Sequence, residues 1–142
     1  MKLFIGLLLG FLAAACLILA LYLLQFVRLD HEAKKRLPQL KANPAAFAAF
    51  WEKKYKKMRL RRPKNAVLFL ISLGLYHQGE YQGAMDRMRF VKRNDPALDQ
   101  DAANALWYAL LVRNAKQDDS IRFYKSCSDS IDRGKSSPWM AL

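Results

Sequence analysis

The chain begins with an uninterrupted apolar segment. From Leu3 to Val27, Gln25 is the only strongly polar side chain. A helix rises about 1.5 Å per residue, so this segment is long enough to cross the ~30 Å hydrocarbon core of a bilayer with some tilt. The pattern therefore predicts one transmembrane helix over residues 1–27.

The first part of this segment, MKLFIGLLLGFLAAAC, also has features of a cleaved leader, because small residues precede Cys16. A secretory signal has an apolar region of only about 7–15 residues, whereas this run continues from Leu17 to Val27. Ala13 also stands where a lipoprotein signal usually has Leu. We expect an uncut anchor, and a lipoprotein cut before Cys16 is the alternative.

Turn residues and helical spacing of apolar positions divide the rest of the chain. A charged connector is expected over residues 28–43, a helical domain over 44–134 and an irregular tail over 135–142. Asn43 as N-cap and Pro44 at the first position would start the domain. About five helices are expected, at 44 to 58 or 59, 66–78, 81–93, 99 or 101 to 114, and 118 or 119 to 133. No strand pattern appears, so the predicted fold class is all-α.

The stretch LFLISLGLYHQGEYQGAMDRMRFVKRNDP has the spacing of two helices joined by a short turn. The turn, the helix contact and the end of the unit fall at Gly79, Tyr81, Ala84 and Pro96. Residues 65–96 in this way resemble a tetratricopeptide repeat, whose other core slots would be filled by Leu68, Ile71, Ser72, Leu75 and Met88. The flanking helices match less well, so we expect one fair repeat between degenerate ones. One repeat cannot bury its own face, and its neighbours must close the core.

The helix AVLFLISLGLY is apolar nearly all round and should be buried on more than one side. The resemblance to tetratricopeptide proteins places Phe69, Leu73 and Tyr76 along an inner groove where partner segments bind. The alternative is that flanking helices cover this face.

The chain is strongly basic. The chain carries a net charge of +12, and the apolar segment contributes almost none of it. Such a balance implies an acidic partner, either lipid headgroups, nucleic acid or an acidic protein face. We do not expect nucleic acid, because no recognised binding motif accompanies the charge.

Basic residues close to a membrane span favour the cytoplasmic side of the membrane. Lys2 alone precedes the span, so we expect the N-terminus outside and the domain in the cytoplasm. The basic residues that closely follow the span are Arg28, Lys34, Lys35, Arg36 and Lys41.

The densest basic segment follows an aromatic helix face formed by Phe47, Phe50, Trp51 and Tyr55. A basic amphipathic helix with aromatic residues is typical of a membrane surface. Alternatively, the aromatic residues are core and the lysines are solvated, which still allows the lysines to face lipid phosphates. The predicted anionic-surface residues are Lys53, Lys54, Lys56, Lys57, Arg59, Arg61 and Arg62.

Within the apolar segment, Gly6, Gly10 and Ala14 recur every four residues on one helix face. Small residues at this spacing allow close approach of another transmembrane helix, from a different membrane protein or a second copy. The alternative is that glycine and alanine are simply common in membrane spans.

The sequence gives little support for a catalytic function. His31 and His77 are the only histidines, and no metal-ligand spacing, phosphate loop or nucleophile motif appears. We therefore expect no catalytic residue, cofactor or metal. The sequence predicts a membrane-anchored protein-interaction module, an adaptor or accessory subunit of a larger membrane complex. The alternative is a peripheral regulator whose basic helix binds anionic lipid headgroups.

Overall fold

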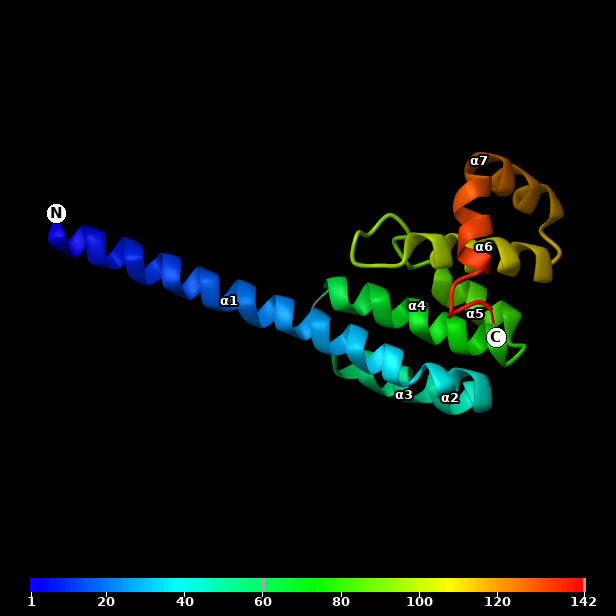
Figure 1. The fold of residues 1–142 in the computed structure, drawn as a ribbon, viewed down its shortest axis with the longest axis horizontal. Helices are drawn as coiled ribbons and strands as arrows, with labels where there is room; N and C mark the ends of the chain where they lie inside the picture. Colours follow the sequence, from blue (N-terminus) through cyan, green and yellow to red (C-terminus); the bar gives the residue numbers. More distant parts are fainter. Residues whose placement is uncertain (60, 142) are drawn as a thin grey trace. The chain divides into compact units, whose positions relative to one another are not determined.

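The computed structural model describes residues 1–59 and 61–141, without the side chains of Arg61 and Arg62. Within these residues the chain forms seven helices and no strand, so the all-α prediction is confirmed (Figure 1). The chain divides into two compact units, Met1–Lys34 and Lys35–Leu142. The second unit contains the described helices α2 to α7. Five of them, α3 to α7, correspond to the five expected for the domain, and α2 lies in the expected connector.

The first unit is formed by α1 (Lys2–Lys35). In the described part of the chain, α1 is the one helix long and apolar enough to cross a membrane, although a signal sequence shares these two properties. The helix continues past Val27, where the span was expected to end. Its last turns are polar and contain an ion pair between Lys34 and Asp30 at i, i+4 (2.9 Å), a spacing that supports helices.

Much of the expected connector is helical. Pro38 explains the break between α1 and the short helix α2 (Leu37–Ala42). Proline has no N–H to bond the carbonyl four residues earlier, and its ring clashes with that carbonyl. The same residue is tolerated in the first turn of a new helix, so α2 restarts around it.

The next helix, α3 (Pro44–Lys57), begins as predicted, because the Asn43 Oδ1 accepts a hydrogen bond from the backbone N–H of Ala46 (3.1 Å). It packs on α4 (Arg61–His77), which starts before the expected residue 66. The two helices approach closely where a Cβ on Gly74 would lie 2.9 Å from the Ala48 Cβ. The side chains enclosed in this part of the core are Phe47, Trp51, Val67, Ile71 and Leu73.

A tight turn at Gly79, with φ of +88°, joins α4 to α5 (Tyr81–Met88). Glycine adopts such a positive φ without steric strain. The Ser72 hydroxyl donates to the Ala84 carbonyl (2.7 Å) and links the two helices in the core. The prediction that this helix ends near residue 93 is wrong, because α5 ends at Met88.

A second pair of helices completes the unit (Figure 1). Helix α6 (Gln100–Arg113) is capped by Asp99, whose Oδ1 accepts from the backbone N–H of Ala102 (3.0 Å). Helix α7 (Gln117–Lys135) begins slightly earlier than expected and is interrupted at Cys127 by non-helical backbone angles. The tail that follows α7 is held at one point by a 2.9 Å hydrogen bond between the His77 Nε2 and the Trp139 carbonyl.

Candidate interaction surface

Two of the three predicted groove residues are in the core. Phe69 is 4% exposed and Leu73 is 0% exposed, because α3, α5 and α6 all pack against α4. The prediction of an open groove at these two positions is therefore wrong, and the alternative of a covered face applies. Tyr76 is half-buried and lines a hollow of about 320 Å³ together with Tyr108 and Val112.

The aromatic face of α3 is also core. Phe47 and Trp51 are fully buried, and Phe50 lies against Trp51 with ring centroids 5.0 Å apart. Burial of large aromatic side chains contributes much of a small domain's stability. These residues therefore hold α3 on the domain and do not form a free apolar face.

The basic residues of the same helix lie on the outside. Lys53, Lys56, Lys57 and Arg59 are exposed, whereas the Lys54 ammonium lies 5.4 Å from the centroid of the Trp51 ring. The side chains of Arg61 and Arg62 lie outside the described residues. Within α3, Glu52 is the one acidic residue, and its carboxylate bonds Arg87 of α5 (2.6 Å). The exposed cluster thus keeps its positive charge.

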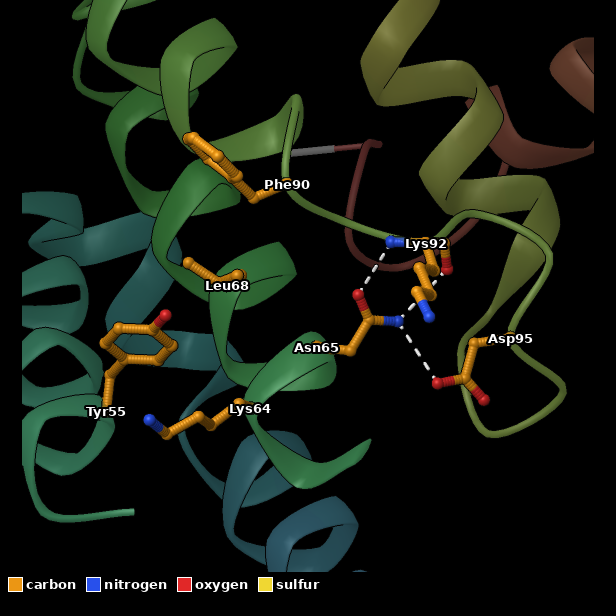
Figure 2. Close-up of a pocket in the computed structure, with 7 residues that line it drawn as sticks. All are labelled: Tyr55, Lys64, Asn65, Leu68, Phe90, Lys92 and Asp95. Atoms are coloured by element: carbon orange, nitrogen blue, oxygen red, sulfur yellow. Dashed lines mark hydrogen bonds between the residues drawn. The ribbon is translucent and has the colours of Figure 1, made fainter. Parts of the chain in front are cut away.

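A hollow of about 340 Å³ lies between α3, α4 and the turn that follows α5 (Figure 2). Figure 2 shows Phe90, Leu68 and Tyr55 along one side of the hollow, with the Lys64 ammonium directed toward Tyr55. That ammonium lies 5.1 Å from the centroid of the Tyr55 ring, a favourable cation–π arrangement. The complete lining is Tyr55, Lys64, Asn65, Leu68, Phe90, Lys92 and Asp95.

The buried Asn65 side chain shapes the hollow. Its Oδ1 accepts from the backbone N–H of Lys92 (2.7 Å), and its Nδ2 donates to the Lys92 carbonyl (3.0 Å) and to the Asp95 Oδ2 (3.1 Å). The bond from the Lys92 N–H takes the place of a helical bond to the Met88 carbonyl, and the Lys92 carbonyl has no helical donor because residue 96 is proline, so α5 does not continue to residue 93. The Asn65 hydrogen bonds also fix the turn that carries Phe90 (Figure 2).

Phe90 is the most unusual residue of this surface, because 77% of it is exposed. Large aromatic side chains are usually buried, and an exposed one surrounded by polar groups is typical of an interaction site. Lys64 and Lys92 flank the hollow on either side of Asn65, and Asp95 is engaged by the Asn65 amide and the Ala97 N–H (3.0 Å). The arrangement can accept an apolar side chain from a segment that also carries negative charge.

Gly6, Gly10 and Ala14 lie on α1, where the structure leaves their face open. A Cβ added at Gly6 or Gly10 would meet nothing within 4 Å. The face has the geometry for close packing by another helix, and no described residue of the unit covers it.

Comparison with protein-family models, curated proteins and solved structures gave no match. The tetratricopeptide resemblance of residues 65–96 therefore stays a prediction. Among the described residues, no group of three or more His, Cys, Asp or Glu side chains could hold a metal ion.

The sequence pattern alone predicts no role for Phe90 or Asn65. One signal for Phe90 was available, because Met85, Met88 and Val91 follow the buried face of a helix and Phe90 falls off that face. The role of Asn65 had no local signal, since its partner lies 27 residues away in the chain.

Proposed function

We propose that this protein is a membrane-anchored interaction module, an adaptor or accessory subunit of a larger membrane complex. Its α1 crosses the membrane once, with the N-terminus outside and the helical domain in the cytoplasm. The domain binds an acidic protein segment at the hollow lined by Tyr55, Phe90 and Lys92. A tetratricopeptide-like hairpin formed by α4 and α5 supports this surface.

The observation that carries the proposal is the exposed Phe90 beside a hollow flanked by Lys64 and Lys92. Binding hot spots consist of a few aromatic or arginine anchors within a more polar surround. Helix α3 contributes Tyr55 to the lining of the hollow, and its exposed lysines attract an acidic segment at longer range, which raises the association rate.

The membrane helix provides a second contact in this proposal. The open face at Gly6, Gly10 and Ala14 packs on a transmembrane helix of the partner protein or of a second copy. Two linked contacts bind more tightly than either alone, because the second forms at a high effective concentration.

The test uses the full chain in its native membrane. A photo-crosslinking phenylalanine analogue is introduced at position 90 and, as a control, at Ile121, which is exposed on α7 away from the hollow. We expect a discrete protein adduct from position 90 alone, and its loss when Lys64→Glu and Lys92→Glu reverse the local charge. Equal adducts from both positions, or none from position 90 at equal expression, would contradict the proposal.

The alternative function is anionic lipid binding, and the exposed Lys53, Lys56 and Lys57 favour it. Each basic residue near an anionic bilayer contributes about 1 kcal/mol. Full-length protein is placed in nanodiscs with or without phosphatidylserine, and lysine labelling by an amine-reactive reagent is followed by mass spectrometry. Slower labelling of these three lysines in anionic discs, without change at Lys125 of α7, supports the lipid alternative; equal labelling excludes it.

A further inference from the structure

A second polar hollow lies between the turn that follows α5 and helices α6 and α7. It measures about 450 Å³, and Arg93 is the one charged side chain among the described residues that line it. Its other lining residues with polar or thiol groups are Asn94, Gln100, Asn104, Ser126 and Cys127. The 340 Å³ hollow beside Phe90 is flanked by two lysines, Lys64 and Lys92, so its chemistry differs from that of the hollow at Arg93.

Two aromatic rings hold the Arg93 guanidinium in place. Its Cζ lies 5.0 Å from the centroid of the Trp107 ring on α6 and 4.8 Å from that of the Phe123 ring on α7. A guanidinium is planar and weakly hydrated, and it stacks favourably on aromatic faces. The cation is therefore positioned by the fold itself.

The charge of Arg93 is not compensated. Its Nη1 is buried and has no hydrogen-bond acceptor among the described residues. Burial lowers the pKa of Arg93 from its ordinary value, and the nearby Cys127 thiol opposes this by raising it. A half-buried cation without an acceptor favours the arrival of an anion.

Neutral amides supply further donors around the cation. The Asn104 Nδ2 donates one hydrogen to the Ser130 hydroxyl (2.9 Å), and its second hydrogen remains for a ligand. Gln100 is also the first residue of α6, where the helix dipole favours negative charge. The Ser126 hydroxyl already donates to the Phe123 carbonyl (2.7 Å) and adds no donor.

We infer that this hollow binds a carboxylate group, with Arg93 as the cation and the Gln100 and Asn104 amides as neighbouring donors. One guanidinium matches the single charge and the two oxygens of a carboxylate, which it bonds bidentately. A dianionic phosphate normally requires more positive charge than one arginine provides. The carboxylate belongs either to a small free acid or to the C-terminal residue of a peptide, since the volume admits both.

The test measures binding to the full chain in detergent micelles by titration calorimetry. The probes are sodium glutarate for a small acid and N-acetyl-leucine for a peptide C-terminus, with N-acetyl-leucinamide and sodium chloride at equal ionic strength as controls. We expect saturable binding of at least one carboxylate probe and none of the controls. Whichever probe binds more tightly identifies the source of the carboxylate.

Variants connect this binding to Arg93. Arg93→Gln should weaken it by about tenfold or more, because a charge-assisted hydrogen bond is lost. Arg113→Gln is the matched control, since the Arg113 Cζ also lies over an aromatic ring, that of Tyr81 (5.4 Å), outside this hollow. Binding that chloride reproduces, or that Arg93→Gln leaves unchanged, overturns the inference.

A second variant remains decisive if Arg93→Gln does not fold. Asn94→Asp places a carboxylate beside Arg93 within the hollow. It should keep the helical circular dichroism spectrum and abolish binding of the carboxylate probes, because the cation is then neutralised internally. Wild-type affinity in Asn94→Asp would show that Arg93 does not bind the probe.

Discussion

Gly10 of the first unit and two helix glycines of the second, Gly74 and Gly134, have opposite surroundings. A Cβ added at Gly10 of α1 would meet nothing within 4 Å, whereas one added at Gly74 of α4 would lie 2.9 Å from the Ala48 Cβ. At Gly134 of α7, it would overlap the backbone carbonyl of Asp101. Glycine, which has no side chain, allows another helix to approach closely. In the second unit a neighbouring helix of the same fold occupies the space beside Gly74 and Gly134, whereas the space beside Gly10 of α1 is empty.

Apolar side chains follow the same division. None of the most apolar stretch of α1 is buried, while Trp51 and Leu106 in the second unit are fully enclosed. Exposure of a continuous apolar helix in water is strongly unfavourable, and the proposed membrane span would give α1 an apolar environment. Substitutions in the second unit should therefore change its unfolding, and substitutions in α1 should change what it associates with.

The largest expected effect is that of Trp51→Ala. Removal of a fully buried tryptophan should lower the free energy of unfolding by about 3–5 kcal/mol. Urea unfolding of the full chain in detergent, followed by circular dichroism, measures this loss. Trp51→Phe is the matched variant: the Trp51 Nε1 is buried without a partner, so its removal offsets part of the smaller ring's cost. Equal losses for both variants would contradict the packing argument.

Gly134→Ala should have the next largest effect. The added Cβ would overlap the Asp101 carbonyl and lie 2.7 Å from the Ala105 Cβ, so α6 and α7 must separate. Alanine gains about 1 kcal/mol in helix propensity, but overpacking costs about 1–3 kcal/mol and is greatest against rigid backbone. We expect a net loss of about 2 kcal/mol in the same urea experiment.

Gly83→Ala serves as the control for that substitution. A Cβ at Gly83 would lie 3.8 Å from the Leu75 Cδ1, an ordinary contact. The variant should therefore be neutral or more stable by about 0.5–1 kcal/mol. A loss as large as that of Gly134→Ala would mean that close helix approach is not the cause.

The elements that local chemistry defines were predictable from the sequence. Asn43 caps α3, Asp99 caps α6 and Gly79 forms the turn before α5, as expected. Each signal acts over a few residues, so one sequence contains it. The apolar run that forms most of α1 is local in the same sense.

The predictions that were wrong concern features set by contacts between residues far apart in the sequence. The end of α5 depends on Asn65, which is 27 residues from its partner Lys92. The burial of Phe69 and Leu73 depends on helices from both sides of the sequence. A helix that is apolar all round does not reveal which face stays open, so the groove was predicted on a face that the fold covers.

In α1, Gly10→Leu tests the other side of the comparison. The added bulk should prevent close packing on a partner helix and reduce co-purification of the partner or second copy from membranes. The urea unfolding of the second unit should stay unchanged, because a Cβ added at Gly10 would meet nothing within 4 Å. Leu8→Ile, on another face of α1, is the control. Equal recovery with both variants contradicts a role for the Gly6–Gly10–Ala14 face.

The smallest expected effect concerns pH and the tail of the second unit. Burial lowers the pKa of His77, although its hydrogen bond with the Trp139 carbonyl acts in the opposite direction. The unfolded chain therefore binds more protons than the folded one below its ordinary pKa of about 6.5. Stability from this group is present above that pH and declines as pH falls further.

We expect the free energy of unfolding to fall between pH 7.5 and 5.5, by less than about 1 kcal/mol because the half-buried His77 is partly screened by solvent. His77→Gln keeps a donor for the Trp139 carbonyl and removes the titration, so its unfolding should vary less over the same range. His31→Gln, exposed on α1, should retain the wild-type pH dependence. If His77→Gln loses stability on acidification as steeply as the wild type, another group controls the response and the tail contact at His77 is not pH-sensitive.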